Sequence, residues 1–148
     1  MKIKIITILL FTISIFITGC SSENNLINYQ DYARALSCIR KVDSEFVINT
    51  QEEYQNLSDY INDYISCENF TLPELDFSKI TLLGKYTSGS GCSVDFLKRV
   101  YKFDSNKTII YQIEVAATGE CDMFVESMNW ITISKVPSDY KVKFIVIY

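Results

Sequence analysis

Histidine is absent from this chain of 148 residues. Without it, the Ser-His-Asp and Cys-His arrangements of nucleophilic enzymes cannot be built, and metal sites with imidazole ligands are excluded as well. The five cysteines include no C-x-x-C pair, so the usual spacing of a structural zinc site is also missing. We therefore expect neither a metal nor a cofactor, and any catalysis would have to use carboxylates.

Clusters of basic residues are also scarce. Lysine and arginine are adjacent only in the pairs Arg40-Lys41 and Lys98-Arg99, and the chain has 14 basic against 18 acidic residues. Nucleic-acid binding requires clustered Lys and Arg that displace counterions from the phosphates. The composition therefore excludes a nucleic-acid partner, and we expect both pairs to lie at solvated edges of the fold.

The one long apolar run, residues 5–17, is too short to span a bilayer. It follows Lys2 and Lys4 and precedes Ile17-Thr18-Gly19-Cys20, the pattern of a bacterial lipoprotein signal with its lipobox. The small residue before the cysteine and the aliphatic residue two positions earlier are what the signal peptidase requires. We predict that residues 1–19 are removed and that Cys20 carries the lipid.

Lipid on Cys20 would attach the protein to a membrane in the cell envelope. Two or three acyl chains hold far more firmly than one, because each buried methylene contributes about 0.8 kcal/mol. Ser21 and Ser22 follow the cysteine, so the aspartate that retains lipoproteins in a Gram-negative inner membrane is missing. An outer-membrane location is favoured, with the periplasmic or external side left open.

Residues 20–28 are small and polar and predict a lipidated tether. Residues 29–148 have the length of a single globular domain, with its β-rich part at residues 72–148. Removal of residues 1–19 takes away two lysines, so the net charge changes from −4 to −6.

Four cysteines remain after Cys20, the even number expected for two disulfides in an exported protein. They allow three pairings. Cys92 and Cys121 each follow a glycine-containing turn at the start of an expected strand, which favours their pairing and leaves Cys38 with Cys67. On the chain-entropy model, closing the second loop stabilises the fold by roughly 3 kcal/mol.

The apolar periodicity predicts a mainly β (α+β) fold, with an antiparallel meander forming a small sandwich or half-barrel. A short N-terminal helix is expected from Tyr29 to Leu36, and a packing helix from Thr50 to Tyr64, where Thr50 and Glu53 have capping-box spacing. Alternating or β-branched runs predict strands at residues 46–48, 79–87, 92–103, 108–117, 121–134 and 141–148, with a hairpin turn at 104–107 and a bulge near Trp130.

The segment Leu75-Asp76-Phe77-Ser78-Lys79-Ile80-Thr81, followed by Thr87-Ser88-Gly89-Ser90-Gly91, resembles the C-terminal domain of the PrcB family, named for a subunit of a bacterial surface protease complex. Residues 46–57 and Val136-Pro137 extend the resemblance over residues 45–148. The family's second glycine and tyrosine are replaced here by Ser90-Gly91-Cys92, a variant that resembles small Bacteroidetes-type lipoproteins. The resemblance implies a mostly β domain that accompanies other surface proteins and carries no catalytic residues.

Few residues suggest chemistry. Gly89-Ser90-Gly91 lacks the lysine and following helix of a phosphate loop, and Asp104-Ser105-Asn106 lacks the glycine and distal glutamate of an EF-hand, so both are interpreted as turns. Ten tyrosines and Trp130 could form a binding face, although a tyrosine-rich core and sheet surface is the favoured interpretation. The carboxylates of the β-rich part are Asp95, Glu114, Glu120, Asp122 and Glu126.

The leading hypothesis is a lipid-anchored, non-catalytic binding or accessory module whose partner is an unidentified protein, by resemblance a protease. One alternative is a protein inhibitor of a hydrolase, which would insert an exposed loop into a foreign active site. The residues expected in that loop are Thr87, Ser88, Gly89, Ser90 and Gly91. Another alternative is a carboxylate-based hydrolase, which requires two acidic groups in a cleft and a raised pKa.

Overall fold

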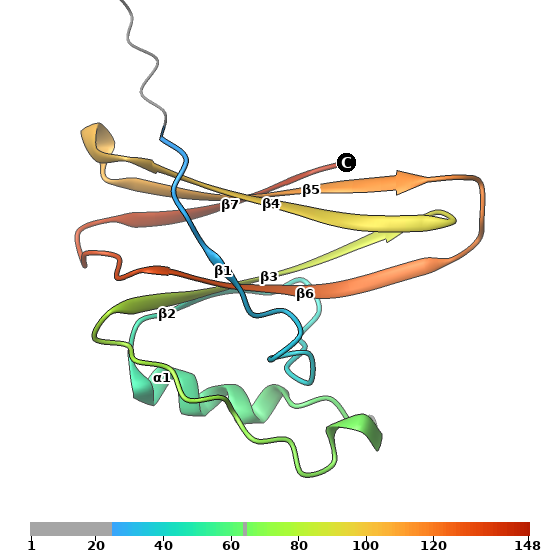
Figure 1. Ribbon diagram of the computed structural model, residues 1–148, viewed down its shortest axis with the longest axis horizontal. Helices are drawn as coiled ribbons and strands as arrows, with labels where there is room; N and C mark the ends of the chain where they lie inside the picture. The colour runs from blue at the N-terminus through green and yellow to red at the C-terminus, as the bar shows by residue number, and fades with distance from the viewer. Residues whose placement is uncertain (1–24, 64) are drawn as a thin grey trace, which may run out of the picture.

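The structure is a computed structural model that describes residues 25–63 and 65–148. Figure 1 shows two stacked β-sheets with a short helical layer beneath them. The strands are β1 (Gln30–Asp31), β2 (Glu45–Ile48), β3 (Ile80–Ser90), β4 (Ser93–Phe103), β5 (Thr108–Thr118), β6 (Phe124–Ser134) and β7 (Lys141–Ile147). The helices are α1 (Gln51–Gln55), η1 (Asn56–Tyr60), η2 (Ile65–Cys67) and η3 (Asp104–Asn106). The predicted mainly β sandwich with a packing helix is confirmed.

The strands form one four-stranded sheet in the order β1-β6-β3-β2 and one three-stranded sheet in the order β4-β5-β7. The chain changes sheet between β3 and β4, between β5 and β6, and between β6 and β7. After the last of these crossings β7 lies parallel to β5, and the other pairs are antiparallel. The architecture is therefore a two-sheet sandwich with one parallel pair, not a simple meander.

Strands β3 and β6 form the middle layer and bury both of their faces. Leu83 and Ile131 point toward the three-stranded sheet, in a core shared with Tyr111. Leu82 and Trp130 point the other way, into a second core below the sheet, which we name the lower core. Two-sided burial explains why each of these strands contains an unbroken run of buried residues, whereas burial alternates along most of β5.

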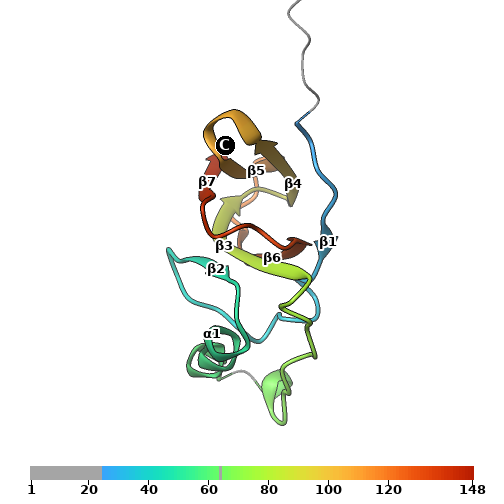
Figure 2. The ribbon, with the colours of Figure 1, turned by 90° about the vertical axis from the view of Figure 1, so that its left-hand side faces the viewer.

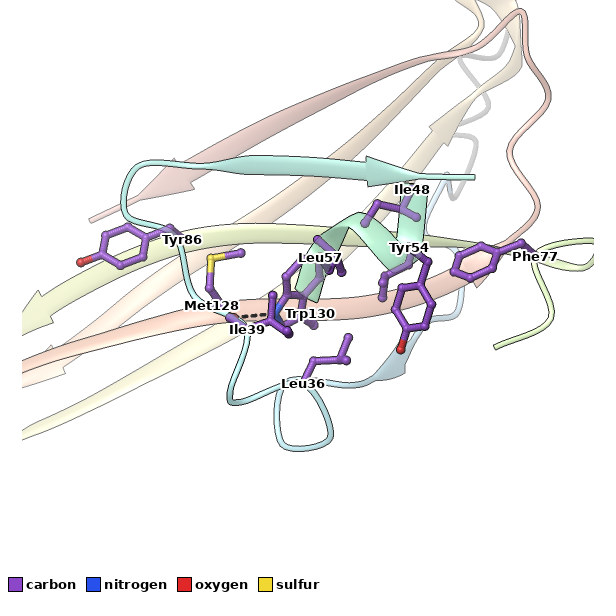
Figure 3. Close-up of a cluster of buried hydrophobic side chains, with 10 residues drawn as sticks. Leu36, Ile39, Ile48, Tyr54, Leu57, Phe77, Tyr86, Met128 and Trp130 are labelled. Carbon is purple, nitrogen blue, oxygen red and sulfur yellow. Dashed lines mark hydrogen bonds between the residues drawn. The ribbon is translucent and has the colours of Figure 1, made fainter. Parts of the chain in front are cut away.

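Trp130 lies at the centre of the second core and is fully buried (Figure 3). Its indole nitrogen donates a hydrogen bond of 3.3 Å to the carbonyl of Ile39, and its ring stacks on Phe46 with 5.2 Å between centroids. The ring also lies over Gly84, the residue opposite it on β3. One side chain thus connects β6, β3, β2 and the N-terminal segment.

The packing helix begins where the capping box predicts and ends earlier than expected. Thr50 accepts a hydrogen bond from the backbone of Glu53, whose carboxylate accepts one in return from the backbone of Thr50. The α-helix ends at Gln55 and continues as the 3-10 helix η1 to Tyr60. The predicted extension to Tyr64 is wrong beyond Tyr60, because Ile61 forms a β-bridge with Ile39; Tyr64 itself lies outside the described residues.

The predicted N-terminal helix is also wrong. After β1 the chain makes a series of turns, with one helix-like hydrogen bond of 3.0 Å from the Leu36 nitrogen to the Tyr32 carbonyl. The Tyr32 backbone nitrogen donates a hydrogen bond to the Trp130 carbonyl, and the Ile39 carbonyl accepts one from the Trp130 indole nitrogen. The segment wraps around Trp130, and this tertiary contact overrides the helical periodicity.

The bulge predicted near Trp130 does not form. Strand β6 pairs with β3 in continuous register from Phe124 to Ser134. The alternation is interrupted because both faces are buried: Met128 packs in the lower core, whereas Asn129 points between the sheets. The strand also begins at Phe124, after the cysteine at which we expected it to start.

The predicted tether is too long at its C-terminal end. The Asn25 carbonyl accepts a hydrogen bond of 2.8 Å from the Lys102 nitrogen, and the Ile27 nitrogen donates one of 2.9 Å to the Val100 carbonyl. We name residues 25–31 the N-terminal strap, since they run from β4 to β6 and cover one side of the sandwich (Figure 2). An ion pair between Lys98 and Asp31 holds the strap in place.

Both disulfides have the pairing that the turns favoured. Cys38 is joined to Cys67 across 5.6 Å between Cα atoms, and Cys92 to Cys121 across 4.7 Å. The first attaches η2 to the N-terminal turns. The second connects the two chain crossings at one end of the sandwich, where the Cys92 nitrogen also donates to the Thr118 carbonyl at 2.7 Å.

Replacing Gly84 with alanine should destabilise the fold by about 1–3 kcal/mol, the usual cost of overpacking a filled core. A Cβ atom there would lie 2.7 Å from Trp130 Cη2 and closer still to two other ring carbons. The measurement is the free energy of unfolding in denaturant. Ser88→Ala, on the same strand and the same face, is the matched control and should change it far less. Equal stabilities for the two variants would contradict the packing described.

Candidate functional site

The segment expected to be an exposed binding loop is mostly strand. Thr87, Ser88, Gly89 and Ser90 are the last residues of β3 and pair with Ser127 to Phe124 of β6, while Thr87 is fully buried. Gly91 and Cys92 alone connect β3 to β4. The loop prediction was wrong because the glycine and serine residues, typical of turns, are accommodated in a paired strand where Gly89 fits against Val94 and Val115.

The carboxylates of the β-rich part lie in separate places. Glu114 pairs with Arg99 at 2.8 Å on the outer face of the three-stranded sheet, and Glu126 pairs with Arg40 at 2.8 Å beside the lower core. Asp95 is exposed on β4, and Glu120 and Asp122 flank Cys121. Within the described residues, no three metal-ligating side chains of the His, Cys, Asp and Glu types come together.

Several exposed carboxyl groups have pKa values below their ordinary range. A hydrogen bond from Lys79 lowers the pKa of Asp76 to about 2. Hydrogen bonds from Lys102 and Lys107 lower the pKa values of Asp104 and Asp139, respectively. These shifts favour the charged form, opposite in direction to what a general acid requires. Asp104 also accepts a hydrogen bond from the Tyr140 hydroxyl. The hairpin turn that contains Asp104 ends at Lys107, which has the left-handed conformation with φ 51°.

The aromatic residues divide between core and surface. Trp130, Tyr54 and Tyr111 are fully buried, so they belong to no exposed aromatic face. Burial raises the pKa of the Tyr54 hydroxyl to about 12 and also raises that of Tyr111. The interpretation of a tyrosine-rich core therefore holds for Tyr54 and Tyr111, whereas Tyr148 is 82% exposed.

One polar cluster was missed from the sequence because its members are far apart along the chain. Tyr86 donates a hydrogen bond to Glu126, which is paired with Arg40. Burial, and then the hydrogen bond to Glu126, raise the pKa of Tyr86 to about 12. The cluster borders a small depression of about 140 Å³ that also includes Ser37. Tyr86, Glu126 and Arg40 thus cover the edge of the lower core, and each has a hydrogen-bond partner there.

A second polar cluster lies between the two sheets. The side-chain nitrogen of Asn129 donates a hydrogen bond to Thr87 Oγ1 at 2.6 Å, and the Tyr111 hydroxyl donates one to the backbone carbonyl of Asn129 at 3.0 Å. Asn129 is fully buried, and its side-chain oxygen has no hydrogen-bond partner among the described residues. Such a buried amide constrains the pairing of β3 and β6, because another register would leave more polar groups without partners.

One recessed surface lies between β2 and the helices. We name it the β2 groove; its volume is about 460 Å³. One wall is the edge strand β2, and the other is formed by α1 and η1. The residues that line the groove are Glu45, Phe46, Val47, Ile48, Glu53, Asn56, Leu57, Asp59 and Tyr60. The groove exists because β2 is the last strand of its sheet while the helical segment after it folds back beneath the same edge.

The floor of the β2 groove is apolar and firmly supported. Phe46 packs against Tyr60 with 5.5 Å between ring centroids and against Trp130 on its other side. Leu57 is buried in the core below. The charged side chains along the groove, Glu45, Glu53 and Asp59, are all acidic. The arrangement can bind an extended chain but offers no nucleophile with an activating base.

No family model, curated protein or solved structure matches the chain. None of the helices in residues 25–63 and 65–148 has the length and apolar character needed to cross a bilayer.

The Tyr86 hydroxyl should ionise near pH 12 instead of its ordinary 10.0. Because the folded state holds the proton more tightly, the added stability is present below pH 10 and is lost as the pH rises toward 12. Phenolate absorbance during an alkaline titration, with Tyr86→Phe as the reference, measures this ionisation. Glu126→Gln should lower the pKa part of the way. Ionisation of Tyr86 near pH 10 in the folded protein would contradict the cluster.

Proposed function

We propose that this protein is an exported lipoprotein of the cell envelope, anchored through Cys20 at the outer membrane. The observation that carries the proposal is the use of the cysteines. Cys38, Cys67, Cys92 and Cys121 are all joined in disulfides, as is usual in oxidising compartments. Cys20, outside the described residues, is the one cysteine left for another role, and it stands at the lipobox.

The domain acts by binding a protein partner, not by catalysis. Support comes from the β2 groove, an acidic recess beside an edge strand of the sheet, and from the ion pairs that occupy Glu114 and Glu126. The resemblance of residues 45–148 to the PrcB-family domain favours a surface protease as the partner. Its role would then be that of an accessory module in an envelope complex.

Changing Cys20 to alanine should move the protein from the membrane fraction to the extracellular or periplasmic fluid, because the acyl chains would have no attachment site. Cell fractionation followed by immunodetection measures this change. Ser22→Ala leaves the cysteine in place and should keep the protein on the membrane. Membrane retention of the Cys20→Ala variant would show that the anchor is something else.

Cross-linking in intact cells, with the lipidated chain as bait, should capture one dominant envelope protein that the Cys20→Ala variant captures poorly. The lipid determines where the domain meets its partner, so losing the anchor should reduce capture. Mass spectrometry of the cross-linked species identifies the partner, and a protease would support the accessory role. Absence of any protein above background would contradict an envelope partner and favour action on a target outside the cell.

A further inference from the structure

We infer that the β2 groove binds an extended, positively charged peptide segment of the partner protein, which adds to β2 as a further β-strand. The inference rests on the proposed binding function and specifies its site and the chemistry of its ligand. Three independent features carry it: the unpaired backbone of β2, the supported apolar floor, and the uniform sign of the charges along the groove.

The backbone of β2 presents unpaired polar groups to the groove. Ser44, just before the strand, accepts a hydrogen bond from the Tyr86 nitrogen at 3.1 Å, so Phe46 and Ile48, two and four residues later, also direct their backbone groups at β3. The backbone N–H and C=O groups of Glu45 and Val47 therefore point away from β3, toward the open edge of the sheet. An added strand would satisfy these groups, as in β-augmentation.

The groove supplies contacts that a bare strand edge does not. A peptide lying beside β2 would place alternate side chains toward η1, over the apolar floor that Tyr60 and Phe46 form. Phe46 rests on the fully buried Trp130, so this floor is preformed and loses little entropy on binding. Strand addition would give affinity, and the floor would select the side chains.

The charge of the groove favours a cationic ligand. Glu45, Glu53 and Asp59 contribute three carboxylates to the described lining of the groove, which includes no lysine or arginine. The nearest cation at its Tyr60 end is Lys41, which lies 4.5 Å from the centroid of the Tyr60 ring and donates to its hydroxyl at 3.3 Å. Lys85 pairs with Glu45 at 3.1 Å, and the Glu53 carboxylate is engaged in the helix cap. Asp59, in contrast, forms no ion pair within the described residues, and it is the carboxylate best placed to meet a lysine or arginine of the ligand.

The second free edge, β7, fits this ligand less well. Lys141 donates to the Lys107 carbonyl at 2.9 Å, so the backbones of Val142, Phe144 and Val146 face outward in the parallel pattern. This edge carries Lys141 and Lys143, which would repel a cationic peptide, and α1 and η1 lie beneath the other sheet, away from β7 (Figure 1). Figure 2 shows β7 and β2 on the same side of the molecule, opposite the N-terminal strap. The β7 edge therefore serves as the internal control.

The test uses the full lipidated chain, purified in detergent micelles, and a fluorescent peptide of about seven residues that alternates valine with lysine. Fluorescence anisotropy should show saturable binding, weakened at least tenfold when glutamate replaces lysine in the peptide. Two further peptides carry N-methyl groups on alternate backbone nitrogens, one on the odd-numbered and one on the even-numbered residues. One of them should fail to bind and the other should bind, because only every second peptide N–H donates to β2. Equal binding of the lysine and glutamate peptides, or of both methylated peptides, would overturn the inference.

Variants of the protein locate the site. Val47→Pro removes an outward N–H without breaking a bond to β3 and should weaken peptide binding about tenfold. Val142→Pro makes the same change on β7 and should leave binding unaltered. Asp59→Asn should weaken binding of the lysine peptide several-fold and leave binding of the glutamate peptide no weaker. Loss of binding in Val142→Pro but not in Val47→Pro would overturn the inference in favour of β7.

The failure of this inference is separable from failure of the proposed function. If cross-linking captures one envelope partner but the lysine peptide does not bind, the domain binds its partner elsewhere and the groove is not the site. If the peptide binds at β2 while Cys20→Ala stays on the membrane, the groove inference stands and the anchor is wrong. Amide chemical shifts of Glu45 and Val47 on peptide addition provide a measurement that needs no variant.

Discussion

The contact between Trp130 and Gly84 is the constraint on which the rest of the structure depends. The indole occupies the space that a side chain on Gly84 would fill, so glycine at that position lets β6 and β3 pair in this register without displacing the ring. The same ring supports Phe46 on β2 and holds the carbonyl of Ile39. The edge strand, the N-terminal turns and the floor of the groove are therefore positioned by one side chain.

The two-sided burial of β3 and β6 decides how the remaining elements are arranged. One face takes the three-stranded sheet, and the other takes α1, η1 and the N-terminal turns. The chain must then cross between sheets three times, and the Cys92–Cys121 disulfide links the two crossings that lie side by side. The buried amide of Asn129 adds specificity to this arrangement, because its nitrogen donates to Lys85 and Thr87 of the neighbouring strand β3.

The surface available for binding follows from which edges the fold leaves open. The N-terminal strap covers the side of β4 and β6, and its ion pair between Asp31 and Lys98 fixes it there. The edges of β2 and β7 remain on the opposite side. With an anchor at Cys20, only a short segment separates the lipid from Asn25, which is hydrogen-bonded to Lys102, so the domain would be held close to the membrane. The acidic groove at β2 is the open edge that has a second wall.

Local sequence located most of the long strands and the start of the packing helix, because alternation, turn residues and the Thr50–Glu53 capping box act over a few residues. It favoured the observed cysteine pairs among the three possible pairings. It also suggested the signal and lipid site, which rest on a linear motif. Tertiary structure alone decided that residues 32–39 wrap Trp130 instead of forming a helix, that Thr87 to Ser90 are strand, and that β7 pairs in parallel with β5. The β2 groove belongs to the same class: Phe46, Asp59 and Tyr60 line it only because the sheet ends at β2 and the helices fold back beneath that edge, a long-range arrangement that no local pattern encodes.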